Sequence, residues 1–366
     1  MTSSFSSEPA KAETVAPPSA STPIRTLIVD DSAFVRKVVR EMLNRSPFIE
    51  VVGTARDGEE ALRLVEELKP DVITCDLVMP QMNGVQFVRA QMARRPLPVL
   101  ILSASAQDAE LGLQALSAGA VDFVRKPTAL ATEELLGIRT ELVEKVKAAA
   151  RAPLDSLTEA TPLAAMNLSP AAATVHAKVD LIVIGISTGG PQALRRVIPQ
   201  LPKDFPVPIA VVLHMPVGYT GPFATKLGEL SQVRVVEATE GEPLLPGTVV
   251  IAAAGRHLLV RRNAGGDLVA QLSLQPLDKV HRPSADVLFQ SAAETLQQRV
   301  LAVVMTGMGD DGKQGAAWVK SQGGMVITES KSSCVIYGMP RSVEEAGLSD
   351  ASVPLDGIAA ALLQYL

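Results

Sequence analysis

Aromatic side chains, cysteines and long apolar runs are all scarce in this sequence of 366 residues. Phe, Trp and Tyr make up 3% of the chain and its net charge is −5, whereas nucleic-acid-binding proteins present basic surfaces with stacking aromatics. With only Cys75 and Cys334, the chain cannot form a disulfide framework, which favours a reducing, cytoplasmic location. No apolar run reaches the ~18 residues that a membrane-spanning helix needs. We therefore expect no nucleic-acid partner and no insertion into a membrane.

Length and texture divide the chain into two predicted domains. The sequence is longer than one ordinary domain, and its 47% of apolar residues can form buried cores. Residues 1–23 are rich in Ser, Pro, Ala and Thr, lack the apolar core of a signal peptide and are predicted to be disordered. Residues 24–147 form the first predicted domain, 148–178 a linker without sustained periodicity, and 179–366 the second domain.

Both domains alternate between short apolar runs and amphipathic segments, which predicts an α/β fold. The first has such runs at 26–30, 50–53, 71–75, 98–103 and 120–124, with a helix after Asp31. The second has them at 180–186, 208–214, 233–237, 300–306 and 324–328. Uniformly apolar strands between helices indicate parallel sheets covered on both faces, hence a doubly wound second domain. Two β-rich stretches around Asn263–Asp267 predict an antiparallel hairpin within 247–274.

Polar residues follow the predicted strands of the first domain. Asp30 and Asp31 follow the first strand, and Asp76 ends the third. The carboxyl ends of parallel strands meet at one edge, so these carboxylates repel one another unless a cation joins them. Hard oxygen ligands with room for water suit Mg²⁺. Ser103 and Lys126, after the fourth and fifth strands, could bind phosphoryl oxygens at the same edge.

These positions make residues 24–145 resemble a response-regulator receiver domain. The motifs VDDS (29–32), DLVMP (76–80), LSAS (102–105) and KP (126–127) support the match. The resemblance implies a five-stranded (βα)₅ fold with Asp76 as the phosphoacceptor. It also implies a Mg²⁺ site and a set of switch residues. The implied metal ligands are Asp30, Asp31, Asp76 and the Val78 carbonyl; the implied switch residues are Ser103, Lys126 and Phe123.

A glycine-flanked serine opens the second domain. Gly185-Ile186-Ser187-Thr188-Gly189 fits the G-x-S-x-G pattern between an apolar strand and a helix that begins near Pro191. Such a turn lifts a nucleophilic hydroxyl clear of a sheet, and helix N-terminal N–H groups there can stabilise an oxyanion. The alternative is a glycine-rich turn or a phosphate-binding loop.

A serine nucleophile needs a base and an orienting carboxylate. His214 ends a predicted strand and projects at the same edge as Ser187, while His281, before a helix that begins near Ser284, is the second candidate. His176 lies in the predicted linker, and the position of His257 favours a structural role for that side chain. The run Gly307–Gly312 delivers Asp310 and Asp311, which spacing alone does not distinguish.

Residues 179–366 resemble the catalytic domain of chemotaxis protein-glutamate methylesterases. The matching motifs are IGISTGGP (184–191), HMP (214–216), HRPSADVLF (281–289), TGMGDDG (306–312) and SSCVIYGMP (332–340). Leu213 stands where this family often has Gln. The resemblance implies that Ser187 is the nucleophile, His214 the base and Asp311 the orienting acid. It also implies that the Met308 N–H is an oxyanion donor and that Thr188 and His281 line the site.

The two resemblances together imply a phosphorylation-regulated enzyme of sensory adaptation. It would demethylate glutamyl methyl esters on chemoreceptors, releasing methanol, and could deamidate receptor glutamines by the same acyl chemistry. A chemosensory histidine kinase would be the phosphodonor, and the esterase would need no cofactor. The competing interpretation is a non-catalytic, phosphorylation-dependent binding protein on receptor arrays, which the presence of the Ser, His and Asp motifs disfavours.

Overall fold

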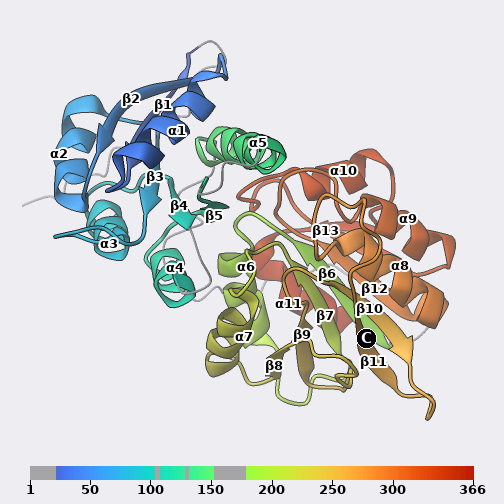
Figure 1. The fold of residues 1–366 in the computed structure, drawn as a ribbon. Coiled ribbons are helices and arrows are strands. Elements are labelled where there is room, and N and C mark those ends of the chain that lie inside the picture. The colour runs from blue at the N-terminus through green and yellow to red at the C-terminus, as the bar shows by residue number, and fades with distance from the viewer. Residues whose placement is uncertain (1–21, 104–107, 128–131, 152–178) are drawn as a thin grey trace, which may run out of the picture.

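The computed structural model describes residues 22–103, 108–127, 132–151 and 179–366. They form two α/β domains that lie side by side (Figure 1). This confirms the predicted fold class: a receiver-like parallel sheet, followed by a larger parallel sheet with an antiparallel pair of strands. His176 and the predicted linker from residue 152 onward lie outside the described residues.

The first domain contains a parallel sheet in the order β2-β1-β3-β4-β5. Its strands are β1 (Ile24–Val29), β2 (Ile49–Ala55), β3 (Val72–Asp76), β4 (Val99–Ser103) and β5 (Asp122–Arg125). Its helices are α1 (Ala33–Asn44), α2 (Gly58–Leu68), α3 (Gly84–Arg94), α4 (Ala109–Ser117) and α5 (Thr132–Ala149). The predicted helix after Asp31 is α1, which buries Val35 and Val39 but leaves Phe34 exposed.

The second domain contains a parallel sheet in the order β14-β13-β12-β6-β7-β9-β8. Its strands are β6 (Leu181–Ile186), β7 (Ile209–Leu213), β8 (Arg234–Glu237), β9 (Thr248–Ile251), β12 (Val300–Val304), β13 (Met325–Glu329) and β14 (Ala351–Val353). A separate antiparallel pair comprises β10 (His257–Arg262) and β11 (Leu268–Ser273).

Helices cover both faces of this sheet (Figure 1). They are α6 (Gly190–Val197), α7 (Thr220–Glu229), α8 (Ala285–Leu296), α9 (Lys313–Ser321), α10 (Met339–Glu345) and α11 (Leu355–Gln364), with short 3₁₀ turns η3 (Ile198–Gln200) and η4 (Gln297–Arg299). Alternate residues of β6 point to opposite faces, so Ile182 packs in the cluster of α6, α7 and α11, and Val183 in that of α8, α9 and α10.

Strand order explains where this fold can hold a site. From β6 the chain adds β7, β9 and β8 on one side of the sheet, and β12, β13 and β14 on the other. A crevice opens at such a switch point, outside the carboxyl ends of the two neighbouring strands. The loops after β6 and β12 are therefore the expected place for bound substrate.

The antiparallel hairpin predicted within 247–274 is confirmed as β10 and β11. Two strands were not predicted. The first part of that stretch, β9, pairs in parallel with β7 and β8 inside the main sheet. The edge strand β14, three residues long, was not predicted, because so short a run has no periodicity of its own.

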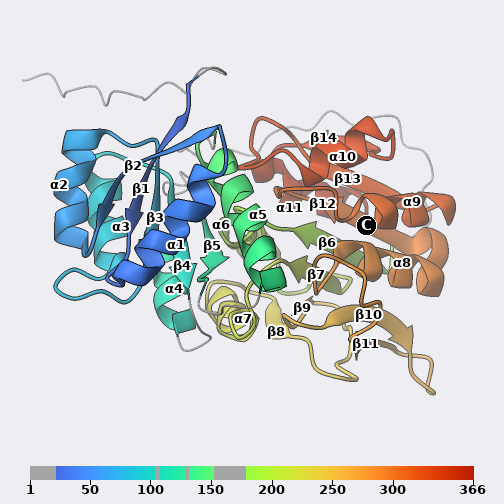
Figure 2. The ribbon, with the colours of Figure 1, turned by 45° about the horizontal axis from the view of Figure 1, so that its top comes forward.

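The two domains meet through α4 and β5 on one side and α6 and α7 on the other (Figures 1 and 2). Gln192 donates to the Ala120 carbonyl oxygen, and Arg195 donates to the Ser117 hydroxyl. At a second contact, Val335 belongs to the same apolar cluster as Ile138 and Leu142 of α5. None of the helices in the described ranges is both long enough and apolar enough to span a bilayer.

Glu329, at the end of β13, is a fully buried carboxylate beneath the loop that follows β12. It accepts hydrogen bonds from the Thr306 N–H at 2.9 Å and from the Ser333 hydroxyl at 3.0 Å. Burial raises the pKa of Glu329 to about 6, although these two donors oppose the shift. The folded state therefore takes up this proton at higher pH than the unfolded chain does.

Replacing Glu329 with Gln should remove a pH dependence of stability. Because the folded-state pKa is raised, the free energy of unfolding falls as pH rises from about 4 to 7, by about 2 kcal/mol from this group. Glu329→Gln keeps an acceptor for Thr306 and should flatten that fall. The measurement is urea unfolding followed by the fluorescence of Trp318, the sole tryptophan, which lies in α9. Exposed Glu345→Gln is the control, and equal slopes for wild type and Glu329→Gln contradict the assignment.

Candidate active site and phosphoacceptor pocket

Three carboxylates gather at the carboxyl edge of the first sheet. Asp30, Asp31 and Asp76 each present an oxygen within 4.8 Å of the others. Lys126, after β5, places its Nζ 2.6 Å from Asp76 Oδ2 and 3.0 Å from Asp30 Oδ2. Burial raises the pKa of Asp76, and the hydrogen bond and charge of Lys126 oppose that rise. The acidic cluster offers the hard oxygen donors that suit a divalent cation.

The residues predicted to act as a switch lie on or just after β4 and β5. Ser103 ends β4 and its carbonyl oxygen accepts the Lys126 N–H at 2.8 Å, so backbone pairing links it to the ammonium that contacts Asp76. Phe123, on β5, is 2% exposed. Val78 has an exposed side chain, and its N–H contributes a hydrogen bond to the Asp76 carboxylate.

The serine turn lies at the switch point of the second sheet. Ser187 follows β6, and its N–H donates to the Thr306 carbonyl oxygen at 2.9 Å, past the end of β12. Gly189 has φ of +78°, the left-handed region that glycine favours. A Cβ on Gly307 would lie 2.8 Å from that of Ser187, so only glycine lets the two loops pass this closely. The nucleophile candidate is thus held on a tight strand-to-helix turn.

A histidine and an aspartate are hydrogen-bonded beside this turn. His214 follows β7, the strand next to β6, and its Nε2 lies 2.9 Å from Asp311 Oδ2. Asp311 also accepts from the Ser284 hydroxyl and the Ala285 N–H, each at 2.7 Å, at the N-terminus of α8. Burial would raise the pKa of Asp311, but these donors hold it well below its usual range. The carboxylate therefore stays ionised and fixes the imidazole ring.

The geometry separates the alternatives that spacing left open. Asp310 is exposed and lies 3.6 Å from Lys313, whereas Asp311 is the aspartate that contacts His214. His281 stacks on His214 with ring centroids 4.1 Å apart. Burial, and then the neighbouring His214, lower the pKa of His281 to about 4, so it is neutral at pH 7. His257 is buried and bonds the Pro276 carbonyl oxygen at 3.0 Å, which is a structural contact.

Three polar groups of the candidate site have no hydrogen-bond partner in the described part of the chain. Within the described residues, the Nδ1 of His214 and the hydroxyl of Thr188 are buried and have no hydrogen-bond partner. The Met308 N–H likewise donates to no described residue. A ring nitrogen able to take a proton and a backbone donor able to bind an oxyanion suit acyl transfer through Ser187.

Some supporting residues were missed by the sequence analysis. Asp286 accepts from the Gly312 and Gly315 N–H groups, at 2.9 and 2.8 Å, and so fixes the loop that bears Asp311. Its place in the first turn of a predicted helix was the available signal. Glu329 gave none, because a carboxylate at a strand end looks like any polar loop residue.

Comparisons with known proteins identify the family of the chain. Residues 182–362 match the family model CheB methylesterase, and residues 26–137 match the response regulator receiver domain. Protein-glutamate methylesterase/protein-glutamine glutaminase 5 of Myxococcus xanthus is 49% identical over 94% of this chain and 98% of its own length. The protein-glutamate methylesterase/protein-glutamine glutaminase of Symbiobacterium thermophilum is 43% identical over 93% of this chain and 96% of its own length.

A solved structure extends the comparison to the fold. The Thermotoga maritima CheB methylesterase catalytic domain is 42% identical, with a TM-score of 0.50 over 52% of this chain and 100% of that one. The part of this chain that is covered, 52%, is the size of its second domain. The chain therefore belongs to the family of CheB methylesterases that have a response regulator receiver domain.

Proposed function

We propose that this protein is a phosphorylation-regulated serine hydrolase that demethylates glutamyl methyl esters on chemoreceptors. The observation that supports it most directly is the hydrogen bond from His214 to Asp311 beside the Ser187 turn. Relatives along nearly the whole chain bear the name protein-glutamate methylesterase/protein-glutamine glutaminase. Deamidation of receptor glutamines belongs to the same proposal, since the acyl chemistry is shared and only the leaving group differs.

In the proposed reaction, His214 takes the proton of Ser187 through its free Nδ1 while Asp311 holds the ring through Nε2. The Ser187 oxygen attacks the γ-carbonyl carbon, and the Met308 N–H stabilises the developing oxyanion. His214 returns the proton to the leaving methoxide, and methanol departs. Water then hydrolyses the acyl-enzyme by the same route. Thr188 and His281 line the site, where a neutral His281 can stack without repelling the imidazolium that forms on His214.

The receiver pocket would hold Mg²⁺ between Asp30, Asp31 and Asp76, with the Val78 carbonyl as a further ligand. The ion would neutralise charge while a phosphoryl group is transferred to the Asp76 carboxylate. Ser103 and Lys126 would contact that group, with a chemosensory histidine kinase as the donor. The free thiols of Cys75 and Cys334 are both buried, which agrees with a cytoplasmic location.

The contacts between the domains support gating by the receiver. Val335 packs with the receiver core, and a Cβ added to Gly189 would lie 2.6 Å from it, so the receiver reaches the serine turn through one side chain. Lys145 of α5 is close enough to His281 to influence its pKa. Ser187 is 8% exposed in this arrangement. A bulky receptor helix would need the receiver to move before it could reach the serine.

Ser187→Ala should abolish methanol release while the protein stays folded. Losses on the order of 10⁴–10⁶ in rate are typical when the nucleophile of a serine hydrolase is removed. The assay is release of labelled methanol from methylated receptor in membranes. A variant within about tenfold of wild type would exclude Ser187 as the nucleophile. Absence of methanol release from the wild type would favour the non-catalytic binding protein.

His214→Ala should be nearly as damaging as Ser187→Ala, and the double variant little worse, because residues that act as one unit are non-additive. His281→Ala should cost less, since Asp311 bonds to His214 and not to its stacked neighbour. The three variants are compared by kcat in the same methanol assay. A larger loss from His281→Ala than from His214→Ala would reverse the assignment of the base.

Two changes test regulation by the receiver. Asp76→Asn should lose stimulation by a phosphodonor and keep the basal esterase rate. A truncation that begins near Lys178 should exceed the unphosphorylated full-length protein severalfold and ignore the phosphodonor. Stimulation is limited by the difference in free energy between docked and undocked domains. If the truncated domain is no more active than the full chain, the receiver acts by activation or recruitment instead of by obstruction.

A further inference from the structure

One side chain of the catalytic domain reaches the switch residues of the receiver. Tyr219, just before α7, is 1% exposed, and its hydroxyl shares a hydrogen bond with the Ser103 hydroxyl. Its ring meets the Phe123 ring edge to face, with centroids 4.9 Å apart. The two receiver residues expected to respond to phosphorylation thus both contact a single tyrosine of the other domain.

The receiver makes room for this ring. Gly112, on α4, faces both aromatic side chains: an added Cβ would lie 2.7 Å from Cε1 of Phe123 and 2.7 Å from Cε1 of Tyr219. Any larger residue at this helical position would have to displace one ring. The fit therefore depends on the two domains being docked and on the present position of Phe123.

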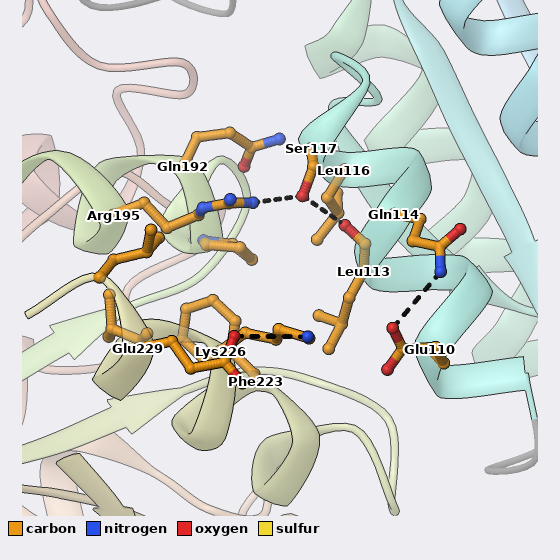
Figure 3. A pocket seen from close by; sticks show the side chains of 13 residues that line it. Glu110, Leu113, Gln114, Leu116, Ser117, Gln192, Arg195, Phe223, Lys226 and Glu229 are labelled. Atoms are coloured by element: carbon orange, nitrogen blue, oxygen red, sulfur yellow. Dashed lines mark hydrogen bonds and ion pairs between the residues drawn. The ribbon is translucent and has the colours of Figure 1, made fainter.

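The other described contacts between the domains do not involve residues of the phosphoacceptor pocket around Asp76. Beside Tyr219, α4 and α6 with α7 enclose a cavity of about 330 Å³. Figure 3 shows Arg195 reaching Ser117 across it, with Leu113 and Leu116 on the α4 side. Leu113, Leu116 and Ser117 all belong to α4 and not to the strand ends that form the phosphoacceptor pocket. Tyr219 instead bonds Ser103, whose backbone is paired with Lys126.

Tyr219 is also close to the catalytic base along the chain. It lies five residues after His214, and its N–H donates to the Pro216 carbonyl oxygen at 3.2 Å, which closes a turn within this loop. The His214 N–H is anchored to the Ile186 carbonyl oxygen at 3.2 Å. One short loop thus has the base at one end and the receiver contact at the other.

We propose that Tyr219 is the residue through which the catalytic domain senses phosphorylation of the receiver. The Ser103 hydroxyl has one proton, so where it donates that proton to Tyr219 it must give up this bond in order to donate to a phosphoryl oxygen on Asp76. Loss of that bond and of the Phe123 contact weakens docking and frees the loop after His214. This inference rests on the proposed function, because it explains how phosphorylation controls the same esterase.

Docking of the domains and phosphorylation of Asp76 must influence each other reciprocally, so phosphorylation itself can be measured. If phosphorylation weakens the Tyr219 contact, the contact must oppose phosphorylation by the same factor. With acetyl phosphate as donor, an Asp76 carboxylate oxygen attacks phosphorus, the P–O bond to the acetyl group breaks, and acetate leaves. With both acetyl phosphate and acetate in large excess, so that transfer in both directions outpaces hydrolysis of the acyl phosphate, the phosphorylated fraction reports on docking without any esterase assay.

The decisive variant is Tyr219→Phe in the full chain with Mg²⁺ and acetyl phosphate. It removes only the hydroxyl, and one lost hydrogen bond corresponds to about threefold to tenfold in an equilibrium. The ratio of phosphorylated to unphosphorylated Asp76 should rise by that factor. The basal esterase rate should rise, and stimulation by acetyl phosphate should shrink. Tyr365→Phe, in the C-terminal segment, is the control and should behave as wild type.

A double variant tests the partner. In a Ser103→Ala background the hydroxyl of Tyr219 has lost its bond, so adding Tyr219→Phe should change neither readout further. Gly112→Ala should raise the basal esterase rate as Tyr219→Phe does, because its Cβ displaces the ring while alanine favours the helix.

The outcomes distinguish this inference from the proposed function. Wild-type stimulation that is retained in full by Tyr219→Phe, with an unchanged phosphorylated fraction, overturns the inference and leaves the esterase assignment intact. Absence of esterase activity from every form overturns the proposed function, while the phosphorylated fraction still tests the Tyr219 contact.

Discussion

In a parallel sheet every strand ends at the same edge, and both sheets of this chain place their reactive side chains there. Asp30, Asp76 and Lys126 follow or end strands of the first sheet, and Ser187 and His214 follow strands of the second. Residues far apart in sequence meet because strand pairing brings their strand ends together. The reversal of strand order between β6 and β12 then opens the space in which Ser187 lies.

The candidate catalytic site also depends on how the protein solvates two buried carboxyl groups. Asp311 stands at the N-terminus of α8 and receives hydrogen bonds from backbone, hydroxyl and imidazole donors, which lower its pKa. Glu329 is buried as well, but its donors do not offset the loss of water, and its pKa is raised. The first group must be charged to orient His214. The second supports the Thr306 backbone, for which a neutral acceptor also suffices.

The sequence alone was sufficient to predict most of the strands, the parallel architecture and the residues at the ends of those strands, but not the short strand β14. Apolar periodicity and the edge rule place Ser187, His214 and Asp76 without any structure. They could not separate Asp310 from Asp311, because adjacent loop residues differ only in the direction of the side chain. The role of β9 was also missed, because a short apolar run does not show whether its partners are parallel or antiparallel. Tyr219 gave no signal, because its partners belong to the other domain.

Few hydrogen bonds join the two domains in the described residues, but the interface does not have to be strong to hold them together. Residues 152–178 join the two domains covalently, so docking is a unimolecular step that does not depend on protein concentration. Tethered partners typically experience effective concentrations on the order of millimolar. An interface that would be too weak to form between separate molecules can then stay closed most of the time. Under these conditions one hydrogen bond, such as that of the Tyr219 hydroxyl, can be a sizeable share of the docking free energy, which is the size of change that the proposed release by phosphorylation needs.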